Sequence, residues 1–205
     1  MSLTTLQVQL DRGVCTLTLN RPEVRNAMSM TMVQELLTAL EHAEANPAVR
    51  VVVVRGAGGH FCAGGDIGDM AQARMKLAQQ QAQLSAGEAV TERNPIEAVN
   101  AAFGRLCLAY AHASLPLVTV LEGTVMGGGF GLACVSDVSL ARDNVSFRLP
   151  ETSLGIVPAQ IAPFLVERLG YSQAKRLAVT GGRLDAAAAL TLGLVHEVTT
   201  TDGLR

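Results

Sequence analysis

The sequence predicts one α/β domain built around parallel strands. Strand-like and helix-like segments alternate along the 205 residues, which is the pattern of repeated strand–helix–strand units. Residues 49–55 form an almost unbroken valine run, as expected of a strand covered on both faces. Hydrophobic residues make up 49% of the chain, enough for one sizeable core, and no linker divides it.

The first part of the chain predicts a hairpin followed by a helix. Apolar residues alternate at 6–10 and again at 14–20, with an Asp-Arg-Gly turn between the two runs. Residues 29–45 place apolar side chains at helical spacing, and Asn46-Pro47 stops that helix. The valine strand at 49–55 comes next.

The remainder predicts further alternation. Residues 69–112 are mostly helical with a break near 85–95, and the glutamine-rich stretch 76–83 indicates a solvated helix or a mobile lid. Asp185 is a good N-cap for an alanine-rich helix. The other expected elements are strands at 116–122, 138–141, 146–149 and 194–198, helices at 163–169 and 172–179, and two helices that end at Val135 and Leu192.

Composition excludes several classes of protein. The formal net charge of −2 gives no basic field, so nucleic-acid binding is not expected. No apolar run reaches the roughly 20 residues of a membrane span, and the N-terminus has no secretory signal pattern. The four cysteines are scattered without metal-ligand spacing, so we expect no metal site and free thiols in a cytoplasmic protein. Cys62 has no identifiable histidine partner and is predicted to be a packed residue rather than a nucleophile.

Two glycine-rich turns carry the strongest functional signal. Residues 61–66 (Phe-Cys-Ala-Gly-Gly-Asp) and 125–131 (Val-Met-Gly-Gly-Gly-Phe-Gly) each follow a strand-like run and open into a helix-like one. Such turns leave backbone N–H groups free beside the positive end of a helix, so together they could form an oxyanion hole. Glu151 adds a carboxylate beyond the second turn. This combination predicts an enzyme that acts on a thioester; the alternative is a pair of turns that only pack helix on strand.

Several segments resemble the enoyl-CoA hydratase/isomerase, or crotonase, superfamily. The similarity runs from about residue 5 to residue 198, and its motifs stand in the family's order and spacing at 20–27, 61–67, 127–131, 149–158 and 192–198. The resemblance implies a crotonase-like spiral of ββα units over residues 1–198, with acyl-CoA held between the glycine turns. It also implies a homotrimer or dimer of trimers, with no cofactor beyond the coenzyme A of the substrate. Residues 199–205 would begin a C-terminal helical region that is missing or truncated here.

The resemblance also assigns the site residues. The N–H groups of Gly65 and Gly128 would hold the thioester oxygen, and Glu151 would act as acid and base. Arg25 could instead be an ordinary surface cation, and Asp66 a cap for the following helix. The implied contacts to CoA or the acyl group are Arg25, Ala27, Ala63, Gly65, Asp66, Ile67, Gly128 and Gly131.

Two departures from the family pattern bear on the substrate. Gly131 stands where hydratases of straight-chain substrates usually carry a first glutamate, so Glu151 is alone. Residues 157–163 lack the glycine-rich stretch of simple hydratases. Together these departures resemble bacterial hydratases of 3-substituted glutaconyl-CoA, either methylglutaconyl-CoA of leucine breakdown or the isohexenyl homologue of acyclic terpene breakdown. The substrate's own carboxylate would then fill space left vacant at Gly131.

The resulting hypothesis is a lyase that hydrates a 2-enoyl-CoA thioester through an enolate, with one glutamate moving the protons. A single glutamate also suits an enoyl-CoA isomerase or an acyl-CoA decarboxylase of the same fold. A non-catalytic crotonase-like subunit is the alternative from another class, since fold alone does not decide the reaction.

Overall fold

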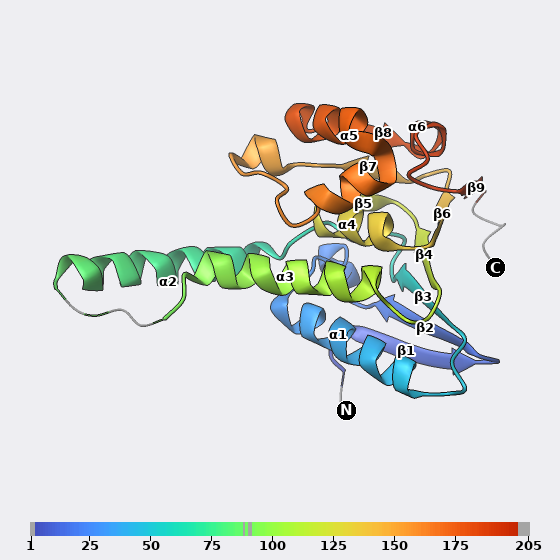
Figure 1. The fold of residues 1–205 in the computed structure, drawn as a ribbon, viewed down its shortest axis with the longest axis horizontal. Coiled ribbons are helices and arrows are strands. Elements are labelled where there is room, and N and C mark those ends of the chain that lie inside the picture. Colours follow the sequence, from blue (N-terminus) through green and yellow to red (C-terminus); the bar gives the residue numbers. More distant parts are fainter. Residues whose placement is uncertain (1–2, 88, 90–91, 201–205) are drawn as a thin grey trace.

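Two sheets and the helices around them make up the fold in the computed structural model, which describes residues 3–87, 89 and 92–200 (Figure 1). The six-stranded sheet has the order β1-β2-β3-β4-β6-β9, and the three-stranded sheet has the order β5-β7-β8. The strands are β1 (Leu6–Asp11), β2 (Val14–Leu19), β3 (Val51–Gly56), β4 (Leu117–Leu121), β5 (Thr124–Met126), β6 (Val138–Arg142), β7 (Ser146–Arg148), β8 (Arg183–Asp185) and β9 (Glu197–Thr199). The helices are η1 (Pro22–Val24), α1 (Met30–Ala45), α2 (Ile67–Ser85), α3 (Pro95–Ala111), α4 (Gly128–Val135), η2 (Glu151–Leu154), α5 (Ala162–Thr180) and α6 (Ala186–Thr191).

The large sheet confirms the predicted hairpin and parallel strands. β1 and β2 pair antiparallel, and β2, β3, β4, β6 and β9 then pair in parallel. β3 lies between β2 and β4, and its Val52 and Val54 are fully buried. The valine run therefore forms an inner strand, as its composition indicates.

Helices α1 and α3 pack on each other beside the large sheet. Met32 and Leu36 of α1 and Leu106 of α3 are fully buried in the common core. The buried hydroxyl of Tyr110 donates a hydrogen bond of 3.0 Å to the carbonyl of Leu36, so the contact includes a satisfied polar group.

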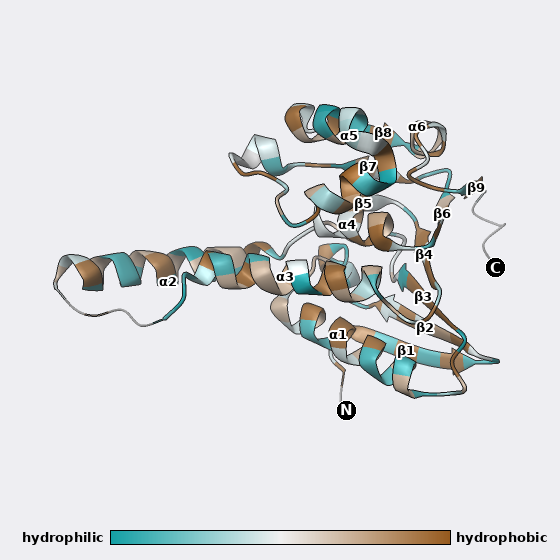
Figure 2. Ribbon diagram, viewed as in Figure 1, coloured by the Kyte–Doolittle hydropathy of each residue, from teal (hydrophilic) through white to brown (hydrophobic). Residues whose placement is uncertain are grey.

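Helices α2 and α3 run side by side, and their far ends project beyond the sheets (Figure 1). Along α2, polar and apolar residues alternate without a continuous apolar stripe (Figure 2), and only Ala73 and Gln80 are buried. The stretch 76–83 is thus mostly exposed helix, in agreement with the solvated-helix alternative.

Most predicted elements are confirmed, and the differences lie in short ones. β5 and β8 have three residues each, too few for a periodic signal, and the sequence did not predict them. Glu151 begins the 3₁₀ helix η2, two residues after the end of the strand expected at 146–149. Within α5, Gly170 has φ 74° and ψ 157°, so the backbone breaks where two helices were expected.

All four cysteines are free, as predicted, and all four are buried. Burial raises the pKa of the Cys62 thiol to about 11 despite hydrogen bonds from backbone groups, so it is a poor nucleophile at neutral pH. None of the helices in the described residues combines the length and apolar character needed to cross a bilayer. The same residues contain no cluster of three or more potential metal ligands.

Asn26 anchors the loop before α1 to the segment that leads into the first glycine turn. It is fully buried with φ 57°, and its side-chain oxygen accepts a bond of 2.8 Å from the Arg21 amide. Its side-chain nitrogen donates to the carbonyls of Ala57 at 2.9 Å and His60 at 2.7 Å. One side chain thus satisfies three backbone groups and fixes two loops against each other.

Replacing Asn26 with alanine should therefore destabilise the protein strongly. The change leaves the half-buried carbonyls of Ala57 and His60 without their donor, and it puts alanine, which has no polar side chain, at a position with φ 57° in the left-handed region. We expect a loss of about 2–4 kcal/mol in the free energy of unfolding, measured by urea denaturation. A matched change at the exposed Asn144→Ala should cost clearly less. Equal losses in both variants would contradict the anchoring role of Asn26.

Candidate active site

The two glycine turns lie against each other. The amide of Cys62 donates to the carbonyl of Thr124 at 3.0 Å, and the amide of Met126 donates to the carbonyl of Cys62 at 2.9 Å. A Cβ built on Gly127 would lie 3.5 Å from the Cα of Gly64. Segments more than 60 residues apart in the sequence are thus held side by side by backbone hydrogen bonds.

The first turn leaves one amide free. The amide of Met28 donates to the carbonyl of Gly64 at 2.8 Å, and the amide of Asp66 donates to the carbonyl of Met28 at 3.0 Å. In this bridge the groups on either side of Gly65 face Met28, so the Gly65 N–H faces away from it. Gly65 donates no hydrogen bond to any residue that the structure describes.

The second turn also leaves a backbone amide free, at the start of α4. Gly127 has φ 45° and donates to the carbonyl of Arg148 at 3.3 Å. Gly128 is the first residue of α4, and its amide likewise has no acceptor among the described residues. A Cβ at Gly128 would come within 2.6 Å of the Phe103 ring, so glycine allows α3 to pack closely here.

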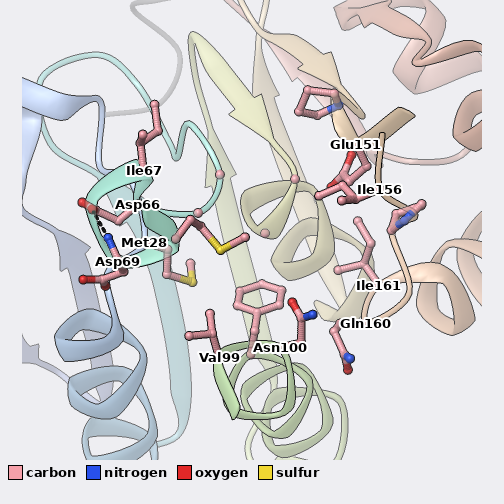
Figure 3. A pocket seen from close by; sticks show the side chains of 18 of the residues that line it. Met28, Asp66, Ile67, Asp69, Val99, Asn100, Glu151, Ile156, Gln160 and Ile161 are labelled. Carbon is pink, nitrogen blue, oxygen red and sulfur yellow. Dashed lines mark hydrogen bonds between the residues drawn. The ribbon is translucent and has the colours of Figure 1, made fainter. Parts of the chain in front are cut away.

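Both free amides open into one cavity of about 470 Å³ (Figure 3). It lies between the start of α2, the α3 helix, the start of α4 and the segment after η2. Of the residues predicted to bind CoA or the acyl group, it is lined by Ala63, Gly65, Asp66, Ile67 and Gly128, together with Glu151.

Glu151 places its carboxylate beside the second turn. Its Oε1 lies 3.3 Å from the position of a Cβ on Gly127, and its Oε2 is buried without a hydrogen-bond partner. Burial raises the pKa of the carboxyl above its ordinary value, and a hydrogen bond with its own backbone amide offsets this only in part. A carboxyl whose pKa is raised is suited to accept a proton and to return it.

The expected vacancy at Gly131 is absent, and that interpretation is wrong. Gly131 is buried and does not line the cavity, since a Cβ there would lie 2.5 Å from Cγ2 of Ile161 and 3.5 Å from Sγ of Cys107. The branched side chain of Ile161 already fills the space, so a substrate carboxylate cannot occupy it.

Two other predicted contacts lie outside the cavity lining. Arg25 is exposed, and its carbonyl accepts a hydrogen bond of 3.0 Å from the amide of Ala63. The carbonyl of Ala27 accepts a bond of 2.6 Å from the Arg21 guanidinium. The backbone of Arg25 therefore braces the first turn, whereas that of Ala27 holds the Arg21 side chain.

Asp66 caps α2, as one of its two interpretations predicted. Its Oδ1 accepts from the amides of Gly68 at 2.8 Å and Asp69 at 3.2 Å, and its Oδ2 lies 2.8 Å from the Arg21 guanidinium. Burial acts to raise the pKa of Asp66, but the hydrogen bonds and charge of Arg21 and the two amides outweigh it, so its pKa is lowered. The group stays ionised and structural.

Sequence reasoning missed several contributors to the site. His60 lies next to the paired turns, and its Nδ1 accepts a 3.1 Å hydrogen bond from the amide of Thr124. Asn100 and Phe103 of α3 line the cavity, as do Gln160 and Ile161 after η2. The i, i+3 spacing of Asn100 and Phe103 was visible in the sequence, but which face of the helix met the cavity was not.

Comparisons with known proteins agree with this geometry. A family model described as enoyl-CoA hydratase/isomerase matches residues 9–205. The structure of Pseudomonas aeruginosa AtuE is 49% identical with a TM-score of 0.88, over 98% of this chain and 72% of that one. An enoyl-CoA hydratase/isomerase from Marinobacter aquaeolei is 46% identical with a TM-score of 0.86, over 97% of this chain and 71% of the other.

A curated relative, 3-hydroxyisobutyryl-CoA hydrolase 1 of Arabidopsis thaliana, is 34% identical over 195 residues. The match covers 95% of this chain but 48% of that protein, so the chain spans about half the length of this relative. The solved structures confirm the predicted crotonase fold. With a family model matched over nearly its whole length, the chain belongs to the enoyl-CoA hydratase/isomerase family.

Proposed function

We propose that this protein hydrates a 2-enoyl-CoA thioester. The observation that carries the proposal is that two backbone amides without an acceptor among the described residues, those of Gly65 and Gly128, line one cavity with the desolvated carboxyl of Glu151. The amides are suited to an oxygen that gains negative charge, and the carboxyl to proton transfer. The family match supports chemistry on a CoA thioester.

In the proposed reaction, Glu151 takes a proton from water as the water oxygen bonds to C3 of the substrate. The electron pair of the C2–C3 double bond moves through C2 to the thioester oxygen, giving an enolate that the amides of Gly65 and Gly128 stabilise. The enolate then collapses as C2 takes up a proton from Glu151, which returns the carboxylate to its starting state. One water is added, and no cofactor is needed besides the coenzyme A of the substrate.

For the acyl group we propose a 3-substituted glutaconyl thioester, as in leucine or acyclic terpene breakdown. Glycine at 131 and the 157–163 segment support it by their resemblance to such hydratases. The substrate carboxylate must bind elsewhere than at Gly131, because Ile161 occupies that space. A negative group near Glu151 would further favour the protonated acid that C2 protonation requires.

Hydrolysis is a second candidate, favoured by the similarity to a 3-hydroxyisobutyryl-CoA hydrolase. It would use the same amides for a tetrahedral oxyanion and release free CoA. Isomerisation would move a double bond between C3 and C2 without adding water. The products of the three reactions differ and can be measured directly.

The decisive assay supplies the protein with a 3-enoyl-CoA, a straight-chain 2-enoyl-CoA and 3-methylglutaconyl-CoA. We expect loss of enoyl absorbance with the last, without free thiol, and a decrease of about 10²–10⁴-fold in kcat for Glu151→Gln. Free CoA would instead indicate hydrolysis, and a gain of enoyl absorbance from the 3-enoyl-CoA would indicate isomerisation. Turnover unaffected by Glu151→Gln would refute the assigned role of this residue.

The raised pKa of Glu151 predicts a pH-dependent stability difference. A group whose pKa is raised on folding stabilises the protein fully below its unfolded pKa, about 4.3, and loses this effect as pH rises through the folded pKa. Glu151→Gln imitates the neutral acid, so it should raise Tm relative to wild type at about pH 7.5. The difference should shrink toward about pH 4 in calorimetry. A Tm lowered by the substitution at neutral pH would contradict an unfavourably buried carboxylate.

Removing the amide hydrogen of residue 65 tests the oxyanion hole. Gly65→Pro deletes the donor without breaking any hydrogen bond among the described residues, and should lower kcat by about 10²–10³-fold. Gly65→Ala is the matched control, since its Cβ would meet no atom within 4 Å and it keeps the N–H. An equal loss in both variants, with unchanged melting temperatures, would point to obstruction of the cavity instead of loss of a donor.

A further inference from the structure

Two carboxamide side chains stand out among the residues that line the cavity. Asn100 comes from α3 and Gln160 from the segment after η2, and both amides lie on the same side of the cavity, next to Ile161 (Figure 3). Apolar side chains including Val99, Phe103 and Ile161 surround them. When a ligand fills the cavity and displaces water, such a polar pair needs a polar partner on the ligand.

Local geometry holds the two amides near each other. Asn100 and Gly104 are four residues apart, so they lie on one face of α3. Oε1 of Gln160 occupies the place where a Cβ on Gly104 would project, so glycine at 104 allows this amide to lie directly on the helix. Gln160 is thereby brought to the α3 face that carries Asn100.

Neither amide has a hydrogen-bond partner among the residues that the structure describes. Asn100 is exposed to the cavity and Gln160 is half-buried, so water can serve both while the cavity is open. An acyl chain that fills the cavity would displace this water. An apolar chain would leave amide hydrogens unsatisfied, whereas a carboxylate would accept from both.

Neighbouring residues connect the two amides to the proposed reaction centre. Gln160 is adjacent in sequence to Ile161, whose methyl group packs on Gly131 of α4, and Asn100 is one turn from Phe103, whose ring packs on Gly128. In a 3-substituted glutaconyl thioester the carboxylate carbon is two bonds from C3, the carbon that takes up water. Its receptor must therefore adjoin the groups that act on C2 and C3.

We infer that Asn100 and Gln160 form the subsite that binds the carboxylate of a 3-substituted glutaconyl thioester, an inference that rests on the proposed hydration. Two neutral amides hold the anion by hydrogen bonds without placing a cation beside Glu151, which would favour its ionised form. Arg74 of α2 also lines the cavity, but the two amides come from the segments that carry Phe103 and Ile161, the residues that pack on Gly128 and Gly131.

The test compares 3-methylglutaconyl-CoA with 3-methylcrotonyl-CoA, which lacks only the carboxylate. We would measure kcat and KM on both for wild type, Asn100→Asp and Gln160→Met. Both changes are close in volume to the native residue, and Asn100→Asp puts a negative charge against the substrate anion. Each should lower the ratio of kcat/KM for the two substrates by about 10- to 100-fold, chiefly by raising KM for the carboxylated one. The matched control is Gln34→Met on the exposed face of α1, which should leave the ratio unchanged.

The outcomes separate the two proposals. If wild type hydrates neither substrate, the proposed function fails and the subsite with it. If wild type hydrates both thioesters and the ratio is unchanged in Asn100→Asp and Gln160→Met, hydration stands and the subsite is wrong. A ratio of kcat/KM for the two substrates that falls only in Arg74→Met would also overturn the Asn100–Gln160 subsite, because it would place the substrate carboxylate at α2.

Discussion

The hydrogen-bonded pairing of the two glycine turns is the constraint on which the site depends. The bonds that join Cys62 to Thr124 and Met126 fix where the amides of Gly65 and Gly128 can point, because each amide is within three residues of a paired position. Close approach is possible because a Cβ at Gly129 would meet that of Cys62 at 2.7 Å. Cys62 is therefore part of the packing between the turns, which accounts for its burial and its unreactive thiol.

The contacts around the paired turns offset the cost of holding an unfavourable group in the site. The carboxyl of Glu151 is desolvated, and its Oε2 has no hydrogen-bond partner among the described residues, which is unfavourable for folding. Such groups persist only where the surrounding structure holds them in place. Here Asn26 satisfies three backbone groups, and the Arg21–Asp66 pair ties the loop before α1 to the start of α2. These anchors surround the first turn but leave its free amide facing the cavity.

The sequence predicted the long elements and the paired turns well, because periodicity and glycine patterns are local signals. It did not predict β5 or β8, whose three residues are defined by their partners in the sheet. It also misjudged Gly131, since the residue that fills the neighbouring space, Ile161, is 30 positions away and meets it only through tertiary packing. The space beside Gly131, which has no side chain, is filled by the branched side chain of Ile161. No motif within one segment of the sequence shows this packing.

The packing of Ile161 against Gly131 has a chemical consequence for the carboxyl of Glu151. A glutamate at position 131 would add a second buried charge, whereas the methyl group of Ile161 adds none and keeps the surroundings apolar. Lower polarity favours the neutral form of Glu151, which is the direction in which its pKa is displaced. One group that changes readily between carboxylate and acid can take the proton from water and return it to C2, so two fixed carboxylates are not required. In this arrangement a second negative charge near the site comes with the substrate, and neutral amides such as those of Asn100 and Gln160 can bind it without drawing Glu151 back to its ionised form.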